Sequence, residues 1–238
     1  MDKICLITGA NRGLGRSLTQ EFKQRGYTVV GLARNEDALK QMQSEKSIDS
    51  YFVCDLLQPE SIEESIRAFT ERHDRLDVLI HNAGIQFQCD IRQSADYTER
   101  IREETQINFL APTALTFGLR AALTKSRGVV IGISSLLHFG PKKSAPGYCA
   151  SKAAFSSWLI NLRAQLQDTG VRVVEVIPGL IRTSMTAAAE SKGVDPDILA
   201  REIYQGMNQD RLVLSGAKFP WTVSRILPGL VKRKLLES

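Results

Sequence analysis

The 238-residue chain contains few of the residues that bind metals or form disulfides, with only 3 histidines and 4 cysteines. The histidines, His73, His81 and His138, are dispersed without the short spacing of metal ligands, and no two cysteines form a Cys-x-x-Cys pair. These scarcities predict no metal site and no disulfide framework. They favour a reducing compartment, for which we expect the cytoplasm.

Long apolar runs and compositionally biased segments are also missing. No run reaches the ~18 apolar residues of a membrane-spanning helix, and the amino terminus lacks the pattern of a signal peptide. Basic residues exceed acidic residues only by 31 to 26, and they form no stripe interleaved with aromatic residues, so nucleic-acid binding is not expected. No linker-like tract divides the chain, and we interpret residues 1–238 as one domain.

Strand-like and helical segments alternate along the chain. The strand-like runs lie near 3–8, 27–32, 51–54, 77–81, 128–134, 171–177 and 211–214. Alternation of this kind predicts an α/β domain of the Rossmann type, with a doubly wound parallel sheet of about seven strands and helices on both faces.

The first turn of this pattern has the composition of a phosphate-binding loop. The apolar run KICLIT is followed by GANRGLG and then by a helical stretch to about Arg25. A strand, a glycine-rich turn and a helix place free backbone N–H groups and the positive end of a helix dipole where a pyrophosphate can bind. Gly9, Gly13 and Gly15 would allow the backbone to approach a dinucleotide closely.

Two arginines indicate which nicotinamide cofactor is bound. The second strand-like run carries no acidic residue and is followed by Arg34, and Arg12 lies within the glycine turn. An acid at the end of the second strand would bind the ribose 2′-OH of NAD, whereas arginine accommodates the 2′-phosphate of NADP. The sequence therefore favours NADP(H) over NAD(H). The alternative is that both arginines are solvated surface residues.

Tyr148 and Lys152 are the strongest indication of chemistry. They lie four residues apart in YCASK, a spacing that places both on one face of a helix. A phenol titrates near ~10 when unperturbed, and a neighbouring cation lowers that pKa. We therefore expect Lys152 to tune Tyr148 as a proton donor or acceptor. Ser135, at the end of the strand-like run GVVIGISS, lies 13 residues before Tyr148.

Together these features resemble the short-chain dehydrogenase/reductase family, and the resemblance extends over nearly the whole chain. The glycine turn TGxxxGxG is the version found in that family. In the family a serine binds the substrate oxygen, a tyrosine exchanges the proton, a lysine tunes the tyrosine and holds the nicotinamide ribose, and an asparagine completes a proton relay. The resemblance assigns these roles to Ser135, Tyr148, Lys152 and Asn108.

The resemblance also implies a set of cofactor contacts along the chain. In the family an acid after the third strand contacts the adenine, the fourth strand ends beside the adenine ribose, and the segment after the sixth strand contacts the nicotinamide carboxamide. The implied cofactor residues are Gly9, Asn11, Arg12, Gly13, Leu14, Gly15, Arg34, Asp55, Leu56, Asn82, Ala83, Gly84, Tyr148, Lys152, Pro178, Gly179, Ile181 and Thr183.

The segments in which the family varies are mostly apolar in this chain, and they include a substrate loop at about 183–199. The expected substrate contacts are Ser135, Leu137, His138, Tyr148, Leu180 and Met185. This lining favours a hydrophobic ketone, aldehyde or 3-oxoacyl substrate. Lys142 and Lys143 leave an anionic carrier thioester open, and a solvated loop position is the alternative for His138.

The function that these features indicate is an NADP(H)-dependent oxidoreductase that interconverts a carbonyl and an alcohol. Two alternatives remain from the sequence. One is an enzyme like the nucleotide-sugar epimerases and dehydratases, which share the fold and the Tyr/Lys pair. The other is a regulatory protein that binds NADP(H) without turnover.

Two helical segments predict self-association. The segments TALTFGL (113–119) and AAFSSWLI (153–160) carry more apolar residues than one buried face requires. In the resembling family these helices form a four-helix interface, so we expect a homodimer or a homotetramer. Phe155 and Trp158 are either contacts of that interface or part of the chain's own core. The basic and apolar segment 218–238 is interpreted as a final helix packed on its own domain or on a partner subunit. A flap over the substrate pocket and contact with a membrane surface are the less favoured alternatives.

Overall fold

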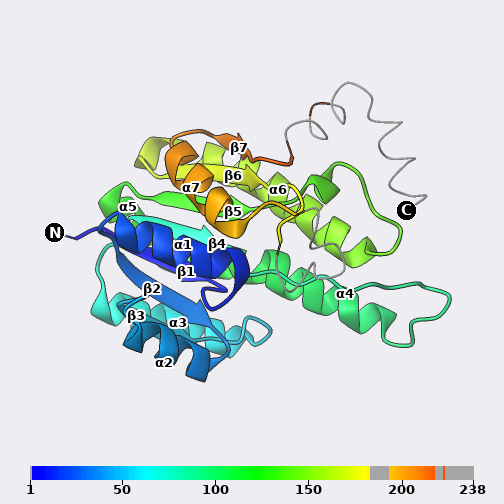
Figure 1. Cartoon of the computed structure of the whole chain (residues 1–238), viewed down its shortest axis with the longest axis horizontal. Helices are drawn as coiled ribbons and strands as arrows, with labels where there is room; N and C mark the ends of the chain where they lie inside the picture. Colours follow the sequence, from blue (N-terminus) through cyan, green and yellow to red (C-terminus); the bar gives the residue numbers. More distant parts are fainter. Residues whose placement is uncertain (1, 183–192, 218–221, 223–238) are drawn as a thin grey trace.

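In a computed structural model, which describes residues 2–182, 193–217 and 222, seven strands form one parallel sheet. Their order across the sheet is β3-β2-β1-β4-β5-β6-β7 (Figure 1). The strands are β1 (Ile4–Thr8), β2 (Thr28–Ala33), β3 (Ser50–Val53), β4 (Val78–His81), β5 (Val129–Ile133), β6 (Arg172–Ile177) and β7 (Arg211–Val213). The predicted α/β fold is confirmed, and every predicted strand agrees with an observed one to within one residue at each end.

Helices connect the strands and pack on both faces of the sheet (Figure 1). The α-helices are α1 (Gly13–Gln24), α2 (Glu36–Ser44), α3 (Pro59–Arg72), α4 (Tyr97–Thr105), α5 (Ala111–Ser126), α6 (Pro146–Leu166) and α7 (Pro196–Gly206). Shorter helical segments are the π-helix η1 (Gln106–Leu110) and the 3-10 turns η2 (Leu136–His138) and η3 (Gln167–Thr169).

Two apolar layers hold the helices against the sheet. Helices α1, α2 and α7 bury their apolar side chains against one face, and α3, α5 and α6 bury theirs against the other. Alternate residues of a strand point to opposite faces. Accordingly Cys5 and Ile7 of β1 belong to the first layer and Leu6 to the second. Because both faces are covered, the strands are nearly continuous apolar runs, which is why the sequence marks them so clearly.

The order of the strands determines where a ligand can bind. The chain extends the sheet from β1 to β2 and β3 on one side, and then returns to place β4 on the other side of β1. At such a reversal the two loops that leave the carboxyl ends of the strands diverge, and ligands of open α/β sheets bind in the crevice between them. In this chain those loops follow Thr8 and His81.

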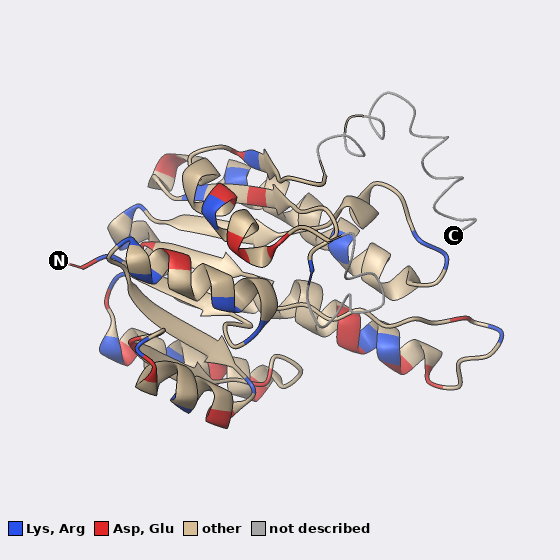
Figure 2. Cartoon of the chain, viewed as in Figure 1, with Lys and Arg blue, Asp and Glu red and all other residues tan. Residues whose placement is uncertain are grey.

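The charged residues of the described part of the chain show no segregation by sign in the view of Figure 2, where acidic and basic residues are interspersed along α2 and α4. No helix among these residues is long and apolar enough to cross a membrane. The described residues also contain no group of three or more His, Cys, Asp or Glu side chains that could hold a metal ion.

Candidate active site

The glycine turn between β1 and α1 lies at the carboxyl edge of the sheet. Gly9 has a φ of +64°, in the left-handed region that favours glycine. A Cβ added at Gly15 would lie 2.0 Å from the carbonyl oxygen of Gly9, so a side chain there would open the turn. The first turn of α1 has no acidic residue, and no side chain caps it at Arg12. The backbone N–H groups at the start of α1 are thus available to donate hydrogen bonds to an anion.

Thr8 and Asn82 hold this turn against the next strand. The Thr8 hydroxyl accepts hydrogen bonds from the backbone N–H groups of Asn82 and Ala83, both at 3.0 Å. The Asn82 side-chain amide donates to the carbonyl oxygens of Thr8 at 3.0 Å and Gly9 at 3.2 Å. The Asn82 side chain therefore supports the shape of the glycine turn. Thr8 is a site residue that the sequence analysis did not single out.

Arg12 and Arg34 lie exposed at the same edge of the sheet. Thr8 of β1 pairs with Leu32 of β2, so the residues that follow the two strands begin side by side. Within the described part of the chain neither arginine forms an ion pair, whereas Arg16 one turn further along α1 pairs with Glu45. Two unpaired cations beside a glycine turn provide positive charge for a phosphate group. Asp55 and Leu56 follow the neighbouring strand β3, and Leu56 is buried.

The catalytic candidates Tyr148 and Lys152 lie in the first two turns of α6. This helix can approach β5 closely because Gly132 carries no side chain, and a Cβ there would lie 2.5 Å from Leu159. The Lys152 ammonium donates to the Ile133 carbonyl oxygen at 2.8 Å and lies 5.8 Å from the centre of the Tyr148 ring. The expected pair is therefore brought together on one helix face.

The electrostatics of the pair differ from the expectation. Burial raises the pKa of Tyr148 to about 12, and a hydrogen bond with Ser135 opposes that rise. Burial also lowers the pKa of Lys152 to about 8. The lowering of the phenol pKa by Lys152 that the sequence predicts is not seen. Burial of the phenol is the largest cause of its pKa shift, and the Lys152 Nζ is directed at the Ile133 carbonyl.

Ser135 lies at the end of β5, where it begins the short turn η2. Its hydroxyl accepts a hydrogen bond from the Leu137 N–H at 3.2 Å and also interacts with the Tyr148 phenol. The strand–loop–helix connection thus returns Ser135 to Tyr148, as its spacing of 13 residues predicted. Leu137 is partly exposed beside it.

Asn108 lies in η1, a π-helical turn that interrupts the run from α4 to α5. Such widened turns frequently occur at functional sites. The Asn108 side chain accepts from the Ile85 N–H at 2.9 Å and donates to the Ile85 carbonyl at 2.9 Å and to the Ser151 hydroxyl at 3.0 Å. A Cβ at Gly84 would lie 3.2 Å from Asn108 Oδ1 and 3.6 Å from Lys152 Nζ, so both groups line the same position.

Glu104 is a buried carboxylate in the wall of this site. One of its oxygens accepts from the Phe87 N–H at 2.7 Å, and the other is a buried oxygen without a hydrogen-bond partner among the described residues. A Cβ at Gly147, the residue before Tyr148, would meet that oxygen at 2.1 Å. Burial raises the pKa of Glu104. Glu104 was not predicted as a site residue, although it lies one helical turn before Asn108, a spacing that could have marked it.

The segment after β6 completes the described part of the site. Pro178 is buried, and Gly179 packs against the backbone of Gly216. Ile181 pairs with Val194, and Leu180 is exposed. Thr183 and Met185 lie outside the described residues, as does most of the predicted substrate loop and all but Thr222 of the segment 218–238.

The His138 side chain does not lie in solvent, which was one of its two expected positions. Its side chain is only 6% exposed and its Nε2 lies 4.0 Å from the buried carboxylate of Glu175, so the ring points into the protein toward Glu175. Glu175 was not predicted as a site residue, because a single acidic residue in the apolar run VVEVI gives no periodic signal.

A model of the short chain dehydrogenase family matches residues 3–193. The chain belongs to this family. Among its relatives, the uncharacterized oxidoreductase DltE of Bacillus subtilis is 30% identical over 79% of this chain and 75% of its own length. An uncharacterized oxidoreductase of Staphylococcus aureus is 30% identical over 89% of this chain and 94% of its own.

Solved structures of short-chain dehydrogenases share the fold. One from Burkholderia cenocepacia, in complex with NADP, has a TM-score of 0.88 at 23% identity and covers 99% of this chain and 98% of its own. Another from Streptomyces avermitilis has a TM-score of 0.84 at 23% identity, covering 98% and 94%. The family model and the curated relatives confirm the predicted family membership, and this short-chain dehydrogenase is an oxidoreductase by family.

Proposed function

We propose that this short-chain dehydrogenase is an NADP(H)-dependent oxidoreductase that interconverts a carbonyl and an alcohol, with Tyr148 as the proton donor and acceptor. The observation that supports it most is the convergence of the Ser135 hydroxyl, the Tyr148 phenol and the Lys152 ammonium where β5 meets α6. A protein that only bound the dinucleotide would have no chemical need for a phenol paired with a serine hydroxyl and a buried lysine.

The residues at the carboxyl edge fit NADP(H). The glycine turn and the start of α1 would hold the pyrophosphate, and Arg12 and Arg34 would bind the 2′-phosphate. Asp55, Leu56 and the segment 82–84 would lie along the adenosine, with Pro178, Gly179 and Ile181 beside the nicotinamide. When bound, NADPH supplies the hydride that reduces the carbonyl carbon.

Residues of the chain itself donate the proton and stabilise the group that loses it. With its pKa raised to about 12, Tyr148 is a neutral phenol near neutral pH, and it can give its proton to the substrate oxygen as negative charge develops there. The Ser135 hydroxyl donates a hydrogen bond to the same oxygen. Lys152 supplies positive charge beside the phenolate that remains after donation. Asn108 supports this arrangement by holding the loop at Ile85 and the Ser151 hydroxyl of α6.

Consumption of NADPH with a panel of ketones, aldehydes and 3-oxoacyl thioesters tests this proposal. We expect the protein to reduce hydrophobic carbonyl compounds, because Leu137 and Leu180 leave apolar surface at the mouth of the site. Tight binding of NADPH with no turnover of any member of the panel would support a regulatory protein instead. Conversion of a nucleotide sugar without net consumption of NADPH would support an epimerase.

We also propose that two copies associate through the outer faces of α5 and α6. Phe117 on α5 is 68% exposed, and Ile160 on α6 is 48% exposed. Leu110, just before α5, is 45% exposed. Phe155, one of the two residues considered for this interface, is 1% exposed and belongs to the core, and Trp158 stacks on it with ring centres 5.8 Å apart. Unpartnered apolar helix faces of this kind favour a protein interface.

Light scattering at micromolar concentration is expected to give at least twice the chain mass of 26.4 kDa. The double variant Phe117→Glu/Ile160→Glu should give a mass near that of one chain, because like charges in the centre of an apolar interface have no partner. Ile91 is 75% exposed on the loop between β4 and α4 and belongs to neither α5 nor α6, so Ile91→Glu serves as the matched control and should leave the mass unchanged. A wild-type protein with the mass of one chain would contradict the proposed interface.

A further inference from the structure

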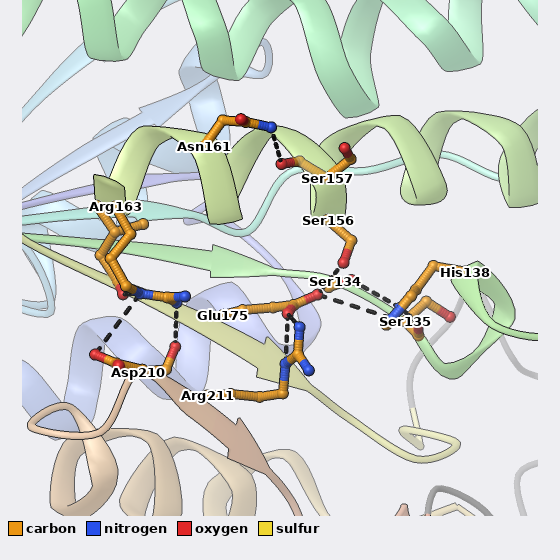
Figure 3. Close-up of polar contacts among 11 residues, drawn as sticks. Ser134, Ser135, His138, Ser156, Ser157, Asn161, Arg163, Glu175, Asp210 and Arg211 are labelled. Atoms are coloured by element: carbon orange, nitrogen blue, oxygen red, sulfur yellow. Dashed lines mark hydrogen bonds and ion pairs between the residues drawn. The ribbon is translucent and has the colours of Figure 1, made fainter. Parts of the chain in front are cut away.

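Glu175 is a fully buried carboxylate behind the segment that carries Ser135. It lies on β6 and is 0% exposed. The Ser156 hydroxyl of α6 donates to its Oε1 at 2.5 Å, and the Arg211 Nε of β7 donates to its Oε2 at 2.7 Å (Figure 3). Arg211 also places a second nitrogen 2.7 Å from Oε2. Side chains from α6 and β7 thus hold the carboxylate in one orientation.

The His138 ring fills the space between this carboxylate and the end of β5 (Figure 3). Its Nδ1 lies within hydrogen-bonding distance of the Ser135 carbonyl oxygen and 3.2 Å from the Ser134 hydroxyl. Its Nε2 faces Glu175 Oε1 at 4.0 Å and has no hydrogen-bond partner among the described residues. The Phe139 ring lies against it, with ring centres 3.7 Å apart. These contacts hold the His138 ring in one position.

The partner of Nδ1 determines where the proton of the ring resides. A carbonyl oxygen can only accept a hydrogen bond, so Nδ1 must carry the hydrogen that binds Ser135. In the neutral ring Nε2 is then a bare acceptor that faces a carboxylate. Burial lowers the pKa of His138, and Arg211 lowers it further, whereas the charge of Glu175 and the bond with Ser135 raise it. The net direction is downward, which keeps the ring neutral near neutral pH.

We propose that His138 and Glu175 are positioning residues for the substrate-binding serine. Glu175, held by Arg211 and Ser156, forms the wall that orients the His138 ring, and the ring holds the Ser135 backbone through its carbonyl oxygen. The Ser135 hydroxyl, on the same residue, is thereby kept beside the Tyr148 phenol. Neither His138 nor Glu175 touches the reacting atoms. The proposal depends on the proposed carbonyl reduction only for the kinetic part of its test.

Nitrogen NMR of the imidazole rings tests the network without a substrate. The chain has only 3 histidines, so the His138 signals can be assigned by their loss in His138→Asn. We expect the neutral ring to carry its hydrogen on Nδ1. Glu175→Gln should lower the His138 pKa by ~1 pH unit, because it removes the neighbouring negative charge. Arg211→Lys keeps the positive charge and should change that pKa little.

Arg163→Met is the matched control for these variants. Arg163 also links α6 to the end of the sheet formed by β6 and β7, through the Val173 carbonyl at 2.9 Å and Asp210, and it has no described contact with His138 (Figure 3). Its substitution should leave the His138 signals unchanged. A His138 pKa that is the same in wild type and in Glu175→Gln, or a neutral ring with its hydrogen on Nε2, would overturn the network.

Steady-state kinetics test the positioning role. His138→Leu should lower kcat by ~10-fold, because a misplaced hydroxyl weakens the transition-state contact, while the Kd for NADPH stays unchanged. His138→Asn should restore most of kcat, since its amide nitrogen can take the place of Nδ1 as donor to Ser135. Equal losses in the two variants, or no loss in either, would overturn the positioning role. If the wild-type protein reduced no carbonyl compound, the proposed function would fail, and the NMR result would still decide the network.

Discussion

Replacing Tyr148 with phenylalanine is expected to lower turnover by ~10²-fold or more, because the variant keeps the ring and deletes the proton that the proposed mechanism gives to the substrate oxygen. The cofactor residues at the glycine turn and at Arg34 lie on other elements, so the Kd for NADPH should remain nearly unchanged. The burial that raises the Tyr148 pKa to about 12 keeps the phenol protonated, which suits donation in the direction of carbonyl reduction.

The measurement is the rate of NADPH consumption with the best carbonyl substrate of the panel, together with a fluorescence titration of NADPH. Tyr51→Phe is the matched control, because Tyr51 is a partly buried tyrosine on β3, which lies at the edge of the sheet remote from β5. It should retain wild-type turnover. A Tyr148→Phe protein with most of its activity would exclude Tyr148 as the acid, and the proposed mechanism with it.

Replacing Arg34 with aspartate is expected to reverse the cofactor preference. The loss of one charge-assisted contact to the 2′-phosphate should cost ~1.5–3 kcal/mol of NADPH binding. The new carboxylate should improve NADH binding, since it can accept a hydrogen bond from the ribose 2′-OH. Arg34 is suited to this role because it is exposed at the carboxyl edge and forms no ion pair within the described residues, so the wild-type side chain need not break a contact to bind phosphate.

Fluorescence titrations of wild type and variant with both cofactors provide the test. Arg67→Asp, at an exposed position on α3, makes the same change in net charge away from the glycine turn and should leave both affinities unchanged. A wild-type protein that binds NADH more tightly than NADPH would contradict the assignment of Arg12 and Arg34. Equal losses in the two variants would attribute the effect to net charge rather than to a contact.

Several site residues could not be predicted from the sequence because their roles depend on contacts between distant positions. The Thr8 hydroxyl binds backbone groups more than 70 residues away. In the sequence, Glu104 is indistinguishable from a solvent-exposed residue of an amphipathic helix, and only the structure shows that it is buried. The sign of the Tyr148 pKa shift also depends on burial, which a spacing of four residues does not specify. His138 was predicted to contact the substrate because its neighbours in sequence are predicted to do so, whereas its ring packs on Glu175.

The sequence by itself determined the family, the parallel sheet and the local groups of site residues. These depend on short-range signals: continuous apolar runs for strands buried on both faces, a glycine turn directly after the first strand, and a tyrosine and a lysine one helical turn apart. Only the tertiary structure decided which of these groups meet and how they are charged. Ser135 reaches Tyr148 because β5 and α6 pack at Gly132, and the carboxylate of Glu175 is stable in an apolar strand only because Arg211 and Ser156 come to it from β7 and α6.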